Sequence, residues 1–487
     1  MSGPTERNRS PRTSATRDSV TARVCERIVA CGGTLPERLL PASRQLFLDG
    51  IAVAVAGARL EPAPQLLADH CADALTGASH GSASLLGLDA QLGTVPAALV
   101  NGASMHVLDY EPMWLPATHA LSPALAPALA LGETLGAGGA QVLTAMVLGI
   151  EMQGRLRQAA GRLESHELRF HPPGFVGPIG AAVAAGHLLG FDAAQFANAI
   201  GIAGSRCGSL FVNLGTMTKA THCAYAAASG LEAALLTRRG FSGCTTLFDP
   251  APQSYAEAFY PRGFDADALL GFGAPFRVED PGYAIKIFPA KYSTHYAITA
   301  ALQARPRLPG DGRNPPAGPI SPDAIRRIHI TAADVPSSDR PNPRTGLDGK
   351  FSLQYTTAVA LIDGHVGLAS FTDQRLARAD VQALLARIDV TLTRDIPSLY
   401  TAGRYLDLVI ELQDGSEIRE RCERPRGSWG AEPISAAEHL QKARDCLATF
   451  LSADAADECV RLCGEIERLD GAGLHALLRL ARTGRAQ

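Results

Sequence analysis

The chain has 487 residues, which fits two or three domains better than one small core. Hydrophobic residues make up 46% and charged residues 19%, and the net charge of −3 argues against a nucleic-acid surface or a polybasic membrane anchor. Aromatic residues are only 6%, while Ala, Leu and Gly dominate, which favours close-packed helices over sheets.

The first segment, residues 1–19, is polar and lacks the apolar run of a secretory signal. We predict a disordered tail, with a basic targeting peptide as the alternative. Ten cysteines are scattered without a CxxC pair, so we expect reduced thiols and a cytoplasmic protein. The most apolar run, Ala124 to Ile150, is broken by Pro127 and Glu133, which predicts buried helices and no membrane span.

Apolar residues recur at helical spacing from residue 20 to about residue 280. Within this stretch we expect two packed helices in Ser122 to Gly149 and further helices at Pro178 to Leu189, Ala194 to Gly204 and Thr218 to Leu236. Cations and a glycine follow the last of these, as expected at a helix C-terminus. A nearly all-apolar helix of small residues belongs in the middle of a bundle.

After residue 281, short stretches alternate apolar and polar residues. Strands are predicted at Arg326 to Val335, Arg387 to Arg394, Leu406 to Leu412 and, beyond an Asp414-Gly415 turn, Ser416 to Arg421. Helices are predicted near Gln354 to Asp363 and Ala379 to Arg387, and the proline-rich segment Arg305 to Ser321 is predicted to be an exposed loop.

The helical period returns from Ser435, and we expect this last segment to dock on the first domain. The prediction is therefore a mainly α protein. A large, discontinuous all-helical domain (20–280 and 426–487) carries an inserted, smaller α+β lid domain (281–425). A cleft between the two is the natural place for a functional site.

Isolated polar residues mark four segments of this apolar background. In the first, Lys219 and His222 lie one helical turn apart at the start of the alanine-rich helix. A lone cation in an apolar helical wall suits the capture of an anionic substrate. The alternative is an ordinary solvated lysine near a helix start.

In the second segment, Asp109 and His119 flank a loop rich in proline and bulky apolar groups, among them Met113 and Leu115. A carboxylate and an imidazole beside apolar groups can have shifted pKa values and serve as acid and base. The alternative is a helix cap and a core histidine.

The third segment places His171 before Pro172-Pro173, at the entrance of a helix of small residues. The fourth holds Lys286 and Lys291 at the start of the lid, where a hinge to the cleft is expected. Two surface lysines are the alternative, although the apolar neighbours of Lys286 indicate burial.

Downstream of the hinge, Phe351 to Tyr355 precede an apolar helix. Ser352 is expected to cap this helix, and Tyr355 to face the cleft.

Several familiar motifs are rejected or missing. The GxSxG pattern at 77–81 follows a helical stretch and not a strand, and the glycines after Pro173 lie outside any βαβ unit. The sequence has no P-loop, HExxH, four-cysteine cluster or calcium loop. We therefore expect no cofactor and no metal. The remaining lysines, histidines, aspartate and tyrosine suit proton transfer next to a carboxylate.

Together these segments resemble the MmgE/PrpD superfamily from about Val20 to Leu478. The resemblance is carried by Asn101-Gly102 with His106 to Asp109, Pro116 to His119, Phe170 to Gly180, Asn198 to Leu236, Lys286 to His295 and Ser352 to Gly367. It implies a large helical domain with an α+β lid, usually as a homodimer. Members of the superfamily include dehydratases, decarboxylases and epimerases of small carboxylic acids.

The resemblance also implies roles for single residues. The catalytic set of the family falls on Asp109, His119, His171, Lys219 and Lys286. A further polar site position of the family falls on Tyr355, and this chain departs from its relatives at Met113, Leu115 and Lys291. His222 of the first polar segment and Ser352 at its helix start complete the predicted substrate-binding set. Met113 and Leu115 replace polar groups of the loop, which hints at a less polar or differently shaped substrate.

The resulting hypothesis is a cofactor-free lyase, a dehydratase or decarboxylase, acting on a small di- or tricarboxylic acid. Lys219 and Lys286 would hold carboxylates, and His119 or His171 would move the proton, with Asp109 orienting the histidine or acting as its partner. Tyr355 would donate a hydrogen bond from the lid. An isomerase that removes and returns an α-proton is one alternative. A non-catalytic carboxylate-binding member of the family is the other.

Overall fold

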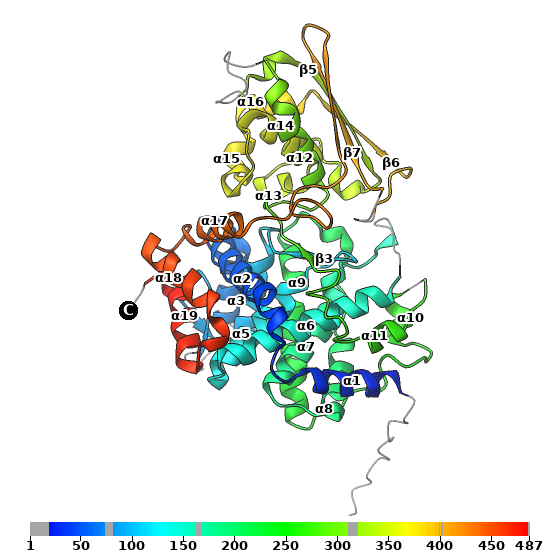
Figure 1. Ribbon diagram of the computed structural model, residues 1–487, viewed down its shortest axis with the longest axis vertical. Helices are drawn as coiled ribbons and strands as arrows, with labels where there is room; N and C mark the ends of the chain where they lie inside the picture. Colours follow the sequence, from blue (N-terminus) through cyan, green and yellow to red (C-terminus); the bar gives the residue numbers. More distant parts are fainter. Residues whose placement is uncertain are drawn as a thin grey trace, which may run out of the picture.

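The structure is a computed structural model that describes residues 19–73, 81–161, 167–260, 262–309, 320–398, 400 and 403–485. Two bodies are stacked along the long axis, a larger helical body below and a smaller α+β body above (Figure 1). The prediction of a mainly α protein is confirmed. The predicted tail (1–18), the GxSxG pattern before Gly81 and residues 310–319 of the proline-rich loop lie outside the described residues.

The larger body is built from helices of the first half of the chain. These are α1 (Val20–Cys31), α2 (Leu40–Leu60), α3 (Pro62–Asp73), α4 (Thr94–His106), α5 (Leu121–Leu135), α6 (Gly139–Ala159), α7 (Pro172–Leu188), α8 (Ala193–Gly204), α9 (Thr218–Arg238), α10 (Tyr255–Phe259) and α11 (Asp267–Leu270). Two short ribbons accompany them, β1 (Ala83–Ser84) with β2 (Gln91–Leu92) and β3 (Met113–Trp114) with β4 (Tyr283–Ala284).

Small residues let α7 and α9 pack closely in the centre of this body. Helix α7 is buried from Pro172 to Gly186. A Cβ on Gly230 of α9 would lie only 2.2 Å from the Pro178 carbonyl oxygen of α7, so only glycine permits this approach. The two helices whose N-termini carry His171 and Lys219 are thereby held against each other.

The upper body, the lid, contains a four-stranded sheet with the order β6-β5-β7-β8. Strand β5 (Ile325–Ala333) runs parallel to β6 (Ile388–Thr393) and antiparallel to β7 (Leu406–Leu412), which pairs with β8 (Glu417–Cys422). Helices α12 (Thr294–Ala304) and α14 (Leu353–Asp363) belong to the same hydrophobic core as the buried strand residues Ile328, Ile330, Leu408 and Ile410.

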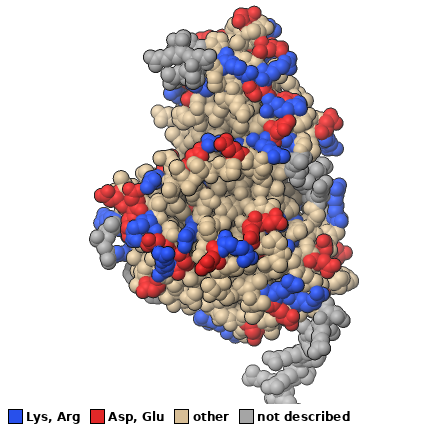
Figure 2. Space-filling view, viewed as in Figure 1, with Lys and Arg blue, Asp and Glu red and all other residues tan. Residues whose placement is uncertain are grey.

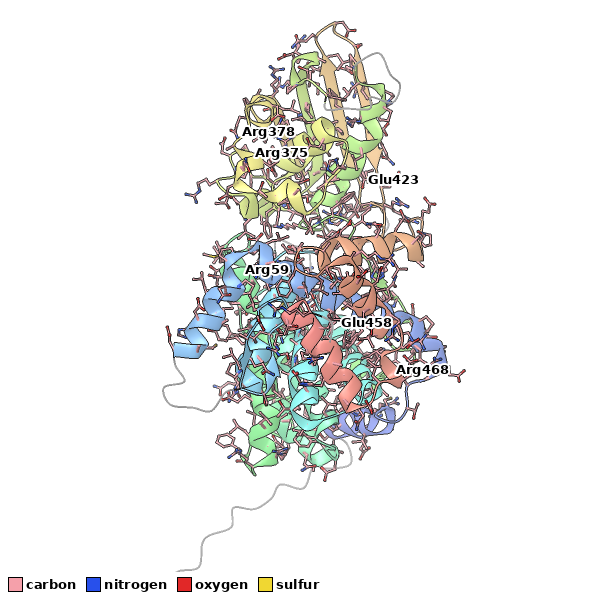
Figure 3. The ribbon with its side chains drawn as sticks, turned by 90° about the vertical axis from the view of Figure 1, so that its left-hand side faces the viewer. Arg59, Arg375, Arg378, Glu423, Glu458 and Arg468 are labelled. Carbon is pink, nitrogen blue, oxygen red and sulfur yellow. The ribbon has the colours of Figure 1, made fainter. Side chains whose placement is uncertain are left out.

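Short helices complete the lid, namely α13 (Gly346–Gly349), α15 (Asp373–Leu376) and α16 (Ala379–Leu385). Arg375 of α15, which is labelled in Figure 3, donates hydrogen bonds to Asp363 at 2.7 Å and to Asp380 at 3.1 Å. It therefore ties together the end of α14 and the start of α16.

The chain then returns to the helical body through α17 (Ala436–Leu447), α18 (Ala453–Gly464) and α19 (Gly471–Thr483). Their apolar residues join the same core as those of α2 and α5. Helix α2 lies in the segment Glu37–Leu60, which is long and apolar enough to cross a membrane, but 72% of its most apolar window is buried in this core. A buried core helix explains that composition.

The predicted strands and most predicted helices agree with the structure to within a few residues. Helix α7 begins six residues before the predicted Pro178, because Pro172 and Pro173 occupy the first turn, where proline is tolerated. Helix α12 was not predicted. The domain boundaries at residues 281 and 425 stay a prediction. One hydrophobic core contains buried residues from Val24 to Val278 and from Ala443 to Ala481, and a separate core contains buried residues from Phe288 to Cys422.

Candidate active site

A cavity of about 80 Å³ lies between the two bodies. The helical body contributes Asp109, His119, His171 and Lys219 to its wall, and the lid contributes Lys291 with Tyr292, Val335 and Tyr400. Met113, Ala117, Leu168, Phe211 and Leu214 add apolar surface. On the face shown in Figure 2, the surface just below the junction of the two bodies is mainly tan, with few charged side chains.

Asp109 is the centre of the polar wall. It follows the end of α4 in a left-handed conformation, with φ +52°, which Asp adopts more readily than most residues. Its carboxylate accepts a hydrogen bond from Lys219 Nζ at 2.8 Å and another from Lys286 Nζ. Burial alone would raise the pKa of Asp109, but Lys219 and Lys286 outweigh it and hold the pKa well below its usual value.

Lys286 lies behind Asp109 and not in the wall of the cavity. Its ammonium group donates to the Asp109 carboxylate, to the Asp109 carbonyl at 2.8 Å and to the Ala290 carbonyl at 3.2 Å. An ammonium group has three donors, and all three are used. The expectation that Lys286 holds a substrate carboxylate is therefore wrong for this conformation. Lys286 orients Asp109 instead, and burial lowers its pKa to about 8.

A chain of hydrogen bonds leads from Lys219 into the helical body. Lys219 Nζ also lies 2.9 Å from His106 Nε2, and His106 Nδ1 lies 2.6 Å from Glu111 Oε1. Since Lys219 donates to Nε2, the proton of the neutral His106 ring belongs on Nδ1, facing Glu111. Glu111 also accepts from the backbone and hydroxyl of Ser122, and burial raises its pKa to about 8.

His119 presents an imidazole ring with spare hydrogen-bonding capacity. Its Nε2 lies 3.7 Å from Asp109 and its Nδ1 3.5 Å from Glu111, and Nδ1 makes no hydrogen bond with the described residues. Burial and then the charge of Lys286 hold the pKa of His119 well below its usual value, so the ring is a neutral base at neutral pH.

His171 and His222 form a second imidazole pair. The Nδ1 atoms of the two rings lie 3.2 Å apart, and His171 lines the cavity while His222 stands behind it. His171 precedes the first turn of α7, and its backbone amide donates to the Ser209 carbonyl at 2.8 Å. Burial and the charge of Lys219 hold the pKa of His171 well below its usual value.

Lys291 supplies the amino group of the lid wall. Its Nζ donates to Ser337 Oγ at 2.5 Å, and the described residues bring no carboxylate within ion-pair distance. Burial and then the charge of Arg340 hold the pKa of Lys291 well below its usual value. A substrate carboxylate placed here would raise this pKa and stabilise the ammonium form of Lys291.

Three of the predicted binding residues lie elsewhere. Tyr355 is fully buried within the lid and donates to the Ser370 carbonyl at 2.5 Å, so the expectation that it faces the cleft is wrong. Ser352 caps α14 as predicted by accepting from the Tyr355 amide, but its hydroxyl donates to the Arg340 carbonyl and does not reach the cavity. Leu115 lines a neighbouring cavity, whereas Met113 lines the polar one.

The sequence did not single out His106 and Glu111 as site residues. His106 lies in the polar segment around Asp109, but it is the last residue of a helix, where a histidine also complements the helix dipole. Glu111 lies in a loop, which usually places a glutamate in solvent. Their five-residue separation gives no helical or strand signal.

Three histidines of this cluster lie close enough together to bind one metal ion. Nitrogen atoms of His106, His119 and His171 lie within 4.8 Å of one another, a spacing that a metal ion could use. However, His106 is engaged at both nitrogens, by Lys219 and by Glu111, and a cation would meet the charge of Lys219. The donor set therefore fits an organic anion better than a metal ion.

Comparison with known proteins identifies the group to which this architecture belongs. Residues 32–265 match the MmgE/PrpD N-terminal domain and residues 288–464 the MmgE/PrpD C-terminal domain. The chain is 30% identical to cis-aconitate decarboxylase from Homo sapiens over 90% of its length and 89% of the relative. It is 31% identical to cis-aconitate decarboxylase from Mus musculus, over 78% of each chain. It is 25% identical to 2-methylcitrate dehydratase from Cupriavidus necator, over 69% of the chain and 71% of the relative.

Proposed function

The chain belongs to the MmgE/PrpD family and is an enzyme of that type, and we propose that it is a cofactor-free lyase that removes carbon dioxide from a cis-aconitate-like tricarboxylic acid. The observation that carries the proposal is the shared cavity of Lys219, Lys291, Asp109 and His119. It combines cations for carboxylates with a neutral base. The relatives are a decarboxylase and a dehydratase, which argues against the alternative of a non-catalytic carboxylate-binding protein.

Substrate binding is assigned to the two cations that face the cavity. Lys219 sits at the start of α9, where the positive end of the helix dipole adds to its own charge. Lys291 approaches from the lid and lacks a carboxylate partner within the described part of the chain. A substrate that bridges these lysines joins the two bodies, so binding favours the closed arrangement.

The reaction needs a proton as well as charge stabilisation. When the carbon–carboxylate bond breaks, its electron pair stays on carbon, spreads into the neighbouring unsaturated carboxylate and takes up one proton. Lys219 lies where it can stabilise the developing enolate-like charge. His119 is neutral before binding, but the added substrate carboxylates raise the pKa of its ring, so proton uptake on binding prepares it as the donor.

Removal of water by the same groups is the closest variant of this function. A dehydratase uses neutral His119 as the base that takes the α-proton, and the resulting enolate meets the same cations. The greater similarity to the two cis-aconitate decarboxylases than to the 2-methylcitrate dehydratase favours decarboxylation.

An epimerase is the second candidate, and one observation favours it. Two neutral imidazoles, His119 and His171, face the same cavity with ring centroids 5.9 Å apart. Bases on two sides of a carbon could remove and return a proton. The product would have inverted configuration and unchanged mass.

Nuclear magnetic resonance in D₂O distinguishes these reactions. EDTA-treated enzyme is incubated with cis-aconitate, 2-methylcitrate and citrate in separate samples. The proposal predicts carbon dioxide release from cis-aconitate with one deuterium in the product. Water loss from the hydroxy acids instead supports the dehydratase. Deuterium incorporation without loss of a leaving group supports the epimerase, and no turnover of any substrate contradicts the proposed function.

We further propose a homodimer and a cytoplasmic location. Exposed apolar side chains at Leu210, Val212 and Met217, close to the cavity-lining Phe211 and Leu214, support an interface between copies. The ten free thiols are compatible with a reducing compartment. Light scattering on the purified enzyme tests the dimer.

A further inference from the structure

The chain has only five lysines, and all five are buried. Lys219, Lys286 and Lys291 belong to the site, and Lys350 meets Glu61 across the junction of the two bodies. The fifth, Lys442, lies on α17, far along the chain from the others. Exposed cations such as the blue groups in Figure 2 are therefore arginines. Because burying an ammonium group is costly, each of the five buried lysines needs a structural or functional reason.

Lys442 belongs to a buried charge cluster between α2 and α17. Its Nζ lies 3.1 and 2.8 Å from the two carboxylate oxygens of Asp49, and His439 Nε2 lies 3.1 Å from the same carboxylate. The exposed fraction is 7% or less for all three residues. Burial alone would raise the pKa of Asp49, but Lys442 and then His439 hold it below its usual value. The cluster is charged and lies outside the cavity.

The third donor of Lys442 points to the active site. Its Nζ donates to the Tyr110 carbonyl at 2.9 Å, and it lies 4.1 Å from the centre of the Tyr110 ring. This carbonyl belongs to the peptide between Tyr110 and Glu111. Lys442 therefore fixes the backbone that carries both carboxylates of the site, Asp109 on one side and Glu111 on the other.

That backbone segment needs to be fixed. Asp109 has φ +52°, a conformation that persists in an L-residue when surrounding contacts determine it. The Asp109 amide donates to the His106 carbonyl at 2.9 Å, and the Asp109 carbonyl accepts from Lys286. The Tyr110 carbonyl is the next acceptor along the chain, and Lys442 satisfies it. These bonds hold the turn from both sides.

A purely structural role explains the cluster poorly. Burying an ion pair costs desolvation, and apolar residues of similar volume are often equally stable or more stable in such places. A role in holding geometry accounts for the buried charges and for the direction of the third donor.

We propose that Lys442, held by Asp49 and His439, is a positioning residue that fixes the Tyr110 carbonyl and thereby the orientation of Asp109 between Lys219 and Lys286. The chain that returns from the lid thus completes the active site of the helical body. Helix α17 lies directly above α2 at the junction of the two bodies, in the right place for this role (Figure 1). The expected effect on turnover rests on the proposed function, but the effect on the lysine environments does not.

The test uses the double variant Asp49→Asn, Lys442→Met. It removes the donor to Tyr110 without leaving an unpaired buried carboxylate, which limits the loss of stability. A second version, Asp49→Leu with Lys442→Met, serves if the first is unstable. The matched control is Arg44→Met with Glu467→Gln, which removes another ion pair between α2 and the C-terminal segment that does not touch Tyr110.

Two readouts are combined. Lysine labelled with ¹³C at Cε gives five wild-type signals, assigned by single substitutions, and the signals of Lys219 and Lys286 report the position of Asp109. We expect both signals to move and kcat on cis-aconitate to fall at least about tenfold, with a smaller change in KM, because small misplacements of a catalytic group are costly. The control variant should keep wild-type signals and kcat.

Two results overturn the proposal. One is unmoved Lys219 and Lys286 signals in a folded double variant, and the other is wild-type kcat in that variant. If the wild type turns over no substrate, the proposed function fails, but the lysine signals still decide whether Lys442 positions Asp109.

Discussion

Replacing Asp109 by Asn gives the sharpest test of the lysine–aspartate cluster. The substitution keeps the size of the side chain and removes the charge that both Lys219 and Lys286 share. Breaking a buried pair by removing one partner costs about 3–5 kcal/mol, because the remaining charge is left unpaired. With an unfolding entropy of about 2.1 cal/mol/K per residue, a chain of 487 residues loses about 3–5 °C in Tm.

The pH dependence of this loss has a definite sign. In the wild type the pKa of Lys286 is lowered to about 8 from an ordinary 10.5, so between these values the folded protein binds fewer protons than the unfolded chain. This group therefore makes the protein more stable as pH rises through that window. The charge of Asp109 raises the pKa of Lys286, so in the variant this pKa falls further. The rise of stability with pH therefore begins at a lower pH in the variant than in the wild type. The stability deficit of the variant should shrink as pH increases.

Thermal unfolding of wild type and Asp109→Asn from pH 6 to pH 9, with turnover measured on the same samples, checks both statements. The double variant Asp109→Asn, Lys286→Met should recover stability but not activity, since it removes a buried charge and leaves the site incomplete. An unchanged Tm with unchanged kcat in Asp109→Asn would refute the reasoning, as would a deficit that grows with pH.

Three further substitutions test other parts of the site. Lys291→Met removes a charged hydrogen bond to the substrate worth about 1.5–3 kcal/mol, so kcat/KM on the accepted substrate should fall about 10- to 150-fold. An unchanged kcat/KM would show that Lys291 does not bind the substrate. Glu111 has its pKa raised by burial from 4.5 to about 8, so it makes the folded protein less stable as pH rises between these values, and Glu111→Gln should flatten that decline in unfolding experiments. Tyr355→Phe should lower stability by about 1 kcal/mol and leave kcat unchanged, because the Tyr355 hydroxyl bonds Ser370 inside the lid; a large loss of kcat at full stability would return Tyr355 to the site.

Much of the fold follows from local sequence pattern. Alternation of apolar and polar residues predicted the strands, and runs of small residues predicted the central helices, because each pattern reflects burial of one face or of all faces. Helix α12 was missed because its start, Thr294-His295-Tyr296, reads as a polar hinge, although all three residues are buried in the lid.

The candidate site was predictable only in part. Asp109, His119, His171, Lys219 and Lys291 do meet at one cavity, as the polar segments and the family resemblance suggested. The direction of each side chain could not be predicted. Ser352 was recognised as a helix cap, but a cap does not determine whether the next turn of the helix faces the cleft or the core of the lid.

Contacts between distant parts of the chain lay beyond any local pattern. Lys442 and Asp49 are 393 positions apart, and in the sequence Lys442 is an ordinary polar residue of an amphipathic helix. Only the return of the chain after the lid brings α17 onto α2 and beside Tyr110.

The proposed lyase chemistry depends above all on Lys219, paired with Asp109. Its role is tested by single-turnover measurement of carbon dioxide release from cis-aconitate by wild type and Lys219→Met. We expect release by the wild type and a loss of at least about 10²-fold in the folded variant, measured well below its unfolding temperature, because the cation that stabilises the developing charge is gone. Equal rates in the two enzymes would contradict it.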